Sequence, residues 1–139
     1  MTAKEYLGQA YRIDQRINSK LEQVTTLREA SKKATATLSP SPRSASPDLH
    51  SMESILVKIF DLEREINGEI DRLVDAKREA MAVIRQVKHP DQQLVLELRS
   101  LDFKSWPSIA EEMRLIPRWV QTLHERALAA VENIFSQKT

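Results

Sequence analysis

Two long stretches of this chain carry apolar residues in steps of three and four, and this spacing limits the fold more than any other feature. In the first stretch the positions are Leu7, Ala10, Ile13, Ile17, Leu21, Val24 and Leu27. In the second they are Ile55, Ile59, Leu62, Ile66, Ile70, Leu73, Ala76, Ala80, Val83 and Val87. Steps of this kind place side chains on one stripe of an α-helix. We therefore predict two long amphipathic helices, each with its charged residues, such as Lys20, largely outside the stripe.

The segment "LSPSPRSASPDLH", at about residues 38–50, separates the two stripes. Its three prolines oppose a continuous helix, so we interpret it as a flexible hinge. Before it, Thr2 and Glu5 form a capping-box pattern at the start of the first helix, which should fade near residues 33–37. After it, Asp48 or Ser51 is expected to cap a second helix of about 38 residues, roughly 57 Å long.

Residues 1–90 are thus predicted to form a long antiparallel helical hairpin in an all-α protein. The chain has only two glycines in 139 residues, which favours helix over strands and their turns. Two helices alone leave apolar flanks in water, among them Tyr6, Tyr11, Leu56 and Phe60. We therefore expect the hairpin to self-associate, which makes the chain a homo-oligomer.

Residues 91–139 have the pattern of a smaller three-helix unit. His89 can cap a helix that has Pro90 in its first turn and ends near Asp102. "FKS" makes a turn, and Ser105 caps the helix "WPSIAEEM". A turn at residues 114–116 leads to Pro117, which opens the last helix. Its expected inner face is Val120, Leu123, Ala127, Val131 and Ile134.

The last two helices have the dimensions of a helix-turn-helix, in which the second helix projects outward residues at base edges. The outward residues here are Arg118, Gln121, Thr122 and Glu125, with Trp119 at the edge. Arginine can pair with guanine and glutamine with adenine. Lys104, Ser105, Arg114 and Arg126 stand where phosphates would lie. The alternative for this region is the packed end of a helical bundle, with its arginines simply solvated and Trp106 and Trp119 as core anchors.

The segments "LVLELRSLDFKSWPSIAEEM" and "RWVQTLHERAL" resemble region 4 of bacterial sigma factors and, more closely, phage transcriptional regulators of the ArpU/RinA type. The two long helical segments also resemble the front half of small phage proteins in that family. The resemblance implies a phage- or prophage-encoded regulator that binds duplex DNA through its terminal helices in the cytoplasm of a bacterial host. It places Arg118, Gln121 and Thr122 at base-facing positions, with Lys104, Ser105 and Trp106 near phosphates.

Three departures from the family pattern, at Ser100, Ile116–Pro117 and Glu125, keep a second function open. In this alternative the hairpin is a protein-interaction adaptor that binds a host or phage protein, and the helix-turn-helix is degenerate. A third hypothesis adds contact with RNA polymerase in the manner of a sigma region. The charge is nearly balanced: residues 1–50 carry +3, residues 51–90 carry −1 and residues 91–139 carry −1.

The sequence offers no pattern typical of an enzyme, a metal site or a cofactor site. It has no cysteine and no glycine-rich phosphate loop, and His50, His89 and His124 are not at zinc-like spacing. No apolar run approaches the roughly 18 residues that a membrane span needs. We therefore expect a non-enzymatic, cytoplasmic protein that neither uses a cofactor nor binds a membrane.

Overall fold

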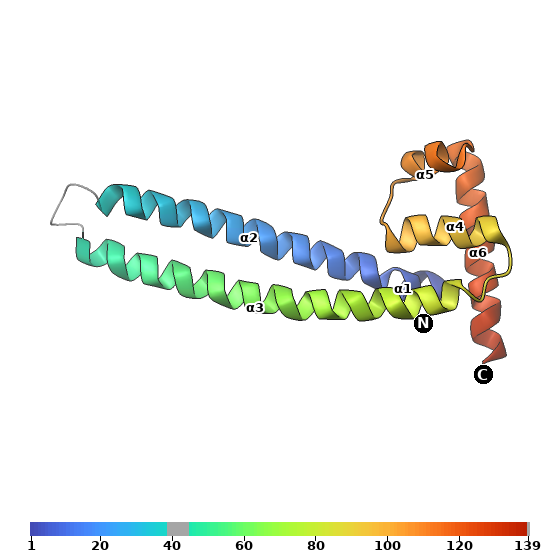
Figure 1. Ribbon diagram of the computed structural model, residues 1–139, viewed down its shortest axis with the longest axis horizontal. Helices are drawn as coiled ribbons and strands as arrows, with labels where there is room; N and C mark the ends of the chain where they lie inside the picture. Colours follow the sequence, from blue (N-terminus) through green and yellow to red (C-terminus); the bar gives the residue numbers. More distant parts are fainter. Residues whose placement is uncertain (39–44, 139) are drawn as a thin grey trace. The chain divides into compact units, whose positions relative to one another are not determined.

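The computed structural model describes the backbone of residues 1–38 and 45–138, and the side chains of residues 1–34 and 51–138. The described chain is all-α, as the sequence predicts, with a long antiparallel α2·α3 pair and a smaller C-terminal helical unit (Figure 1). The elements are α1 (Ala3–Leu7), α2 (Gln9–Leu38), α3 (Ala45–Ile84), α4 (Pro90–Leu96), a π-helical turn η1 (Glu97–Leu101), α5 (Trp106–Met113) and α6 (Pro117–Gln137).

Several predicted helix ends are confirmed. The Thr2 hydroxyl accepts a hydrogen bond from the Glu5 N–H at 3.2 Å, and His89 Nδ1 accepts one from the Gln92 N–H at 3.4 Å. The predicted start of the second long helix is wrong. Neither Asp48 nor Ser51 caps α3, because the helix already begins at Ala45. Pro47 then falls in the first turn, where its missing N–H costs no hydrogen bond. The predicted hinge at Pro40 and Pro42 lies outside the described residues.

The chain divides into two compact units, a first unit of Met1–Ile13 with Arg72–Thr139 and a second unit of Asp14–Asp71. In the second unit, α2 and α3 bury Ile17, Val24, Ile59 and Ile66 against each other. These residues belong to the predicted stripes. The apolar stripe of each helix covers the apolar stripe of the other and excludes water from it. This burial is the main source of stability for two helices of this length.

The centre of this pair holds an ionic layer that the stripe analysis did not predict. Glu69 is buried, with its carboxylate 3.5 Å from Arg16 Nε and 3.8 Å from Lys20 Nζ. The expected stripe residues Leu21 and Ile70 are instead 46% and 42% exposed. Glu69 is buried beside them, and its carboxylate pairs with the two cations of α2. Only the carboxylate of this layer is buried, because the Arg16 and Lys20 side chains are 52% and 23% exposed.

The first unit joins both ends of the sequence in one core. Ala3 and Leu7 of α1 pack with residues from the end of α3 and from α4, η1, α5 and α6. The Ala3 N–H donates to the Glu132 carboxylate of α6, and the Tyr6 and Phe135 rings meet edge to face at 5.3 Å. Packing therefore does not divide the chain into residues 1–90 and 91–139, because the first 13 residues share a core with the last helix.

Candidate nucleic-acid interface

Helices α5 and α6 and the turn between them are formed by local signals that the sequence shows clearly. Ser105 Oγ accepts a hydrogen bond from the Ser108 N–H at 3.3 Å and so caps α5. At the other end of α5 the Leu115 N–H donates to Ala110 O at 2.9 Å and the Arg114 N–H to Glu111 O at 3.3 Å. These two bonds close the helix in the Schellman pattern, with Arg114 in the left-handed conformation (φ 58°) that glycine usually supplies. Three residues thus separate α5 from Pro117.

The inner face of this helix-turn-helix segment is fixed by its burial. Ile109, Val120, Ala127 and Val131 have no exposed surface, and Leu123 has 5%. The predicted inner face of α6 is confirmed for its first four positions, and Ile134 is partly buried against the same core. With that side of α6 covered, the opposite side is set by helical geometry. Arg118, Gln121 and Glu125 are exposed there, as the spacing predicts.

The seven candidate DNA-contacting residues differ in how available their polar groups are. Arg114, Arg118 and Gln121 are exposed. Thr122 is partly buried, and its hydroxyl donates to Arg118 O at 3.2 Å, which occupies its proton but leaves the oxygen able to accept. Ser105 is exposed, but its hydroxyl oxygen caps α5.

The two remaining candidates have intramolecular partners. Lys104 Nζ lies 2.5 Å from the Glu112 carboxylate, so part of its charge is neutralised within the protein. The Arg126 guanidinium is exposed and lies 5.1 Å from the centre of the Trp119 ring. Arg118 and Gln121 are therefore the strongest candidates for base contacts, and Arg114 and Arg126 for phosphates.

The two tryptophans have different environments. Trp106 packs against the core, with the Arg99 guanidinium 4.2 Å from its ring centre and the His124 ring edge-on at 4.9 Å. Trp119 is 40% exposed, so the expectation that it is a core anchor is wrong. It lies at position three of α6, one residue before Val120, which takes the core-facing position. Its exposed ring, near the Arg126 guanidinium, offers an apolar surface with one polar N–H to a partner.

The unit that carries this segment is cationic as a whole. Counted over Met1–Ile13 and Arg72–Thr139, 13 Lys and Arg residues face 10 Asp and Glu residues, a net charge of +3. The second unit has 8 against 10, a net charge of −2. Division of the chain at residue 90 does not show this contrast, because residues 72–90, with five Lys and Arg against two Asp and Glu, belong to the same compact unit as α6. A cationic unit attracts a polyanion such as DNA.

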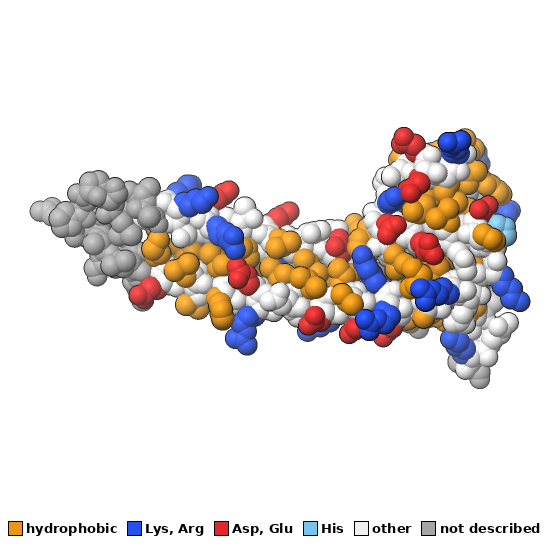
Figure 2. All heavy atoms as spheres, viewed as in Figure 1, with side chains coloured by type: hydrophobic (Ala, Val, Ile, Leu, Met, Phe, Trp, Pro, Cys, Tyr) orange, Lys and Arg blue, Asp and Glu red, His pale blue; other side chains and the backbone are white. Residues whose placement is uncertain are grey.

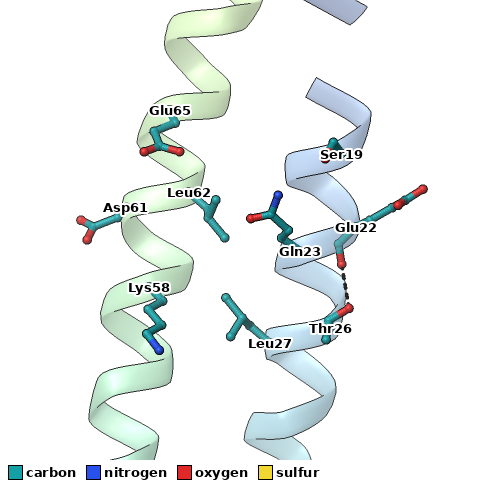
Figure 3. Close-up of a pocket in the computed structure, with 9 residues that line it drawn as sticks. All are labelled: Ser19, Glu22, Gln23, Thr26, Leu27, Lys58, Asp61, Leu62 and Glu65. Carbon is teal, nitrogen blue, oxygen red and sulfur yellow. Dashed lines mark hydrogen bonds between the residues drawn. The ribbon is translucent and has the colours of Figure 1, made fainter. Parts of the chain in front are cut away.

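The second unit has a different kind of surface. A hollow of about 650 Å³ lies between α2 and α3, where Leu27 and Leu62 point toward each other across the gap (Figure 3). Its rim is polar, with Glu22, Lys58 and Asp61 among the lining residues. Figure 2 shows hydrophobic side chains in a row along this helix pair. Leu56, Val57 and Phe60 of α3 are 53%, 60% and 61% exposed, so the expected exposure of Leu56 and Phe60 is confirmed. Of the other two residues expected to be in water, Tyr11 is exposed, whereas Tyr6 packs against the core of the first unit.

Within the described ranges, no three His, Cys, Asp or Glu side chains are grouped so that they could hold a metal ion. None of the helices in residues 1–38 and 45–138 combines the length and apolar character that a membrane crossing requires. The chain matches no protein-family model, and comparisons with curated proteins and with solved structures find no match either. The interpretation of the site therefore depends on its own chemistry.

Proposed function

We propose that this chain is a non-enzymatic transcription regulator that binds duplex DNA through α5 and α6. The phage or prophage origin and the bacterial cytoplasm are part of the proposal and come from the sequence resemblance alone. The observation that carries it is the exposure of Arg118 and Gln121 on α6, on the side of the helix opposite the buried residues Val120, Leu123 and Ala127. A recognition helix needs this combination, because its inner face must fix the direction in which the reading side chains point.

The chemistry of the exposed face fits the major groove. A guanidinium can donate two hydrogen bonds to guanine O6 and N7, and a carboxamide can pair with adenine N6 and N7. Arg114 in the turn and Arg126 further along α6 are cations that can contact the backbone on either side. The net charge of +3 on this unit adds long-range attraction. Glu125 opposes it locally, so we expect moderate affinity.

Selection from a library of random 25-base-pair duplexes tests the proposal and requires no known operator. The full chain should enrich a defined motif, and anisotropy measurements on that duplex should show affinity that falls steeply with salt, because each phosphate contact releases counterions. Absence of any enriched motif, together with binding no tighter than the roughly micromolar nonspecific level, would count against DNA reading.

A protein-interaction adaptor is the second candidate, and the exposed Leu56, Val57 and Phe60 favour it. Three neighbouring large apolar residues on one helix face are a common feature of protein-binding surfaces. The partner in this alternative is a host or phage protein, RNA polymerase among them, or a second copy of the chain. Sedimentation equilibrium of the chain and of Phe60→Glu distinguishes self-association from a monomer. A monomeric wild-type chain would remove the homo-oligomer from the proposal.

A further inference from the structure

A hollow of about 660 Å³ in the first unit lies apart from the base-facing side chains of α6, although Ser105, a candidate phosphate contact, is among its lining residues. Its walls come from α1, the start of α2, η1, the start of α5 and the middle of α6. Three cations and three aromatic rings line it: Lys4, Arg12, Arg99, Tyr11, Phe103 and Trp106. Glu5 is the one acidic residue among the described lining residues. We refer to this hollow as the cationic pocket.

We propose that the cationic pocket binds a small organic anion that carries a flat ring. The excess of positive charge selects an anion, and the aromatic walls select a planar apolar body. The volume lies within the range of small-molecule sites, which is roughly 300–1,000 Å³. The proposal goes beyond DNA binding and does not depend on it, because the pocket residues are not the base-facing residues of α6.

Arg99 is held in a fixed orientation before any ligand arrives. Its Nη1 donates to Lys104 O at 2.9 Å, and its guanidinium lies 4.2 Å from the centre of the Trp106 ring. These two contacts leave further N–H donors of the planar group for an anion. An arginine fixed in this way loses little side-chain entropy on binding, which favours affinity.

The backbone that carries Arg99 is irregular in two places. Residues Glu97–Leu101 form a π-helical turn, and the Asp102 N–H donates to Glu97 O, five residues back, at 3.0 Å. Phe103 follows in the left-handed conformation, with φ 58°, which is costly for a large side chain. Both features are over-represented at functional sites. Here they place Arg99 and Phe103 on the wall of the same pocket.

The Phe103 ring is fixed from two sides. The Tyr11 ring meets it edge-on at 5.7 Å, and Lys77 Nζ lies 4.8 Å from its centre. Tyr11 itself is 48% exposed, so it forms a part of the wall that is open to solvent. A ligand ring can therefore reach the aromatic wall from outside, with its anionic group toward Arg99.

His124 also lines the cationic pocket, and two of the pocket cations act on it. Burial, followed by Arg99 and then Lys4, lowers the pKa of His124 to about 4. The imidazole is thus neutral at pH 7 and does not add to the charge of the pocket. The charged groups that face it are Arg99 of η1, Lys4 and Glu5 of α1, and Arg12 of α2. An anion bound among these cations would offset them and raise the pKa of His124.

Binding can be measured with three ring-bearing anions: benzenesulfonate, phenyl phosphate and adenosine 5′-monophosphate. Benzyl alcohol serves as the ring without charge and sulfate as the anion without a ring. The full-length Trp119→Phe variant leaves Trp106 as its one tryptophan, whose emission reports on the pocket. We expect at least one ring-bearing anion to bind with a Kd between about 10 μM and 5 mM, and both controls to bind at least tenfold more weakly.

Two exposed lysines provide a matched pair of variants. Lys4→Gln removes a pocket charge and should weaken binding about fivefold, whereas Lys88→Gln, outside the pocket, should leave it unchanged. Benzenesulfonate has a charge that does not depend on pH, so it suits an NMR titration of His124. Its binding should raise the pKa of His124 by at least about half a unit, which is a measurable part of the downward shift from 6.5 to about 4. Absence of binding by all three anions below about 10 mM would overturn the proposal. Equal binding of sulfate, or an equal effect of Lys88→Gln, would also overturn it.

Discussion

Replacement of Leu7 by alanine tests whether the first residues of the chain hold the C-terminal helices together. Leu7 is 2% exposed and belongs to the same core as Ile109 and Val120. The change removes three buried carbons, worth about 0.8 kcal/mol each, and leaves a cavity that adds to this loss. We therefore expect the free energy of unfolding to fall by about 3 kcal/mol.

The two tryptophans make the assay specific for the C-terminal helices, since Trp106 lies in α5 and Trp119 in α6. Urea unfolding followed by tryptophan emission reports on those helices, although Leu7 is about 100 residues away in sequence. With a slope of about 1–2 kcal/mol per molar urea, the midpoint should fall by about 2 M. The control is Leu56→Ala, at a position that is 53% exposed, which should shift the midpoint by less than half as much. An unchanged tryptophan midpoint in Leu7→Ala would refute the shared core.

Three further predictions concern stability. Gly68→Ala should raise the free energy of unfolding by about 0.5–1 kcal/mol and the thermal midpoint by about 2–4 °C. The reason is that Gly68 lies inside α3, with open space where the added methyl group would lie. A lower midpoint by calorimetry would contradict this. Glu69→Ala should destabilise the chain by about 1 kcal/mol in urea, because it removes the partner of two cations that are 52% and 23% exposed, whereas Glu69→Leu, which fills a similar volume with apolar atoms, should recover most of that loss. Burial lowers the pKa of His124 from its ordinary value of 6.5 in the unfolded chain to about 4 in the folded chain. Between these two pH values the unfolded chain binds more protons than the folded chain. The free energy of unfolding should therefore fall by up to about 2–3 kcal/mol as the pH is lowered from 6.5 to 4. A His124→Gln variant with the same pH dependence would refute that assignment.

The C-terminal helices could be predicted closely because their ends have local signals. Ser105, with Pro107 two residues later, marks the start of α5 through a side-chain acceptor, and Pro117 marks the start of α6 through a missing N–H. The apolar steps in α6 then decide which face is inside. These effects act over three or four residues, so a single sequence is enough to show them.

The ionic layer and the cationic pocket could not be predicted in the same way, because each needs residues that are far apart in the chain. The partners of Glu69, Arg16 and Lys20, come from the other helix of the pair. Nothing in the sequence around Lys4 marks it as a pocket residue, since that role depends on the packing of α1 against α6. Arg99 lies in a π-helical turn that has no recognisable sequence pattern. The spacing of apolar residues shows which face of a helix is buried, but it does not show which residues of another helix pack against that face.

The most direct measurement of DNA reading compares Arg118→Ala with Arg85→Ala on the duplex that the full chain selects. Both arginines are exposed and belong to the first unit, but only Arg118 lies on the outer face of α6. We predict that Arg118→Ala weakens binding to the selected duplex by about 10- to 100-fold and relaxes the preference at one base pair. Arg85→Ala should change affinity by less than about threefold, through net charge alone. If both variants bind the selected duplex equally well and with the same base preference, Arg118 does not read DNA and α6 is not a recognition helix.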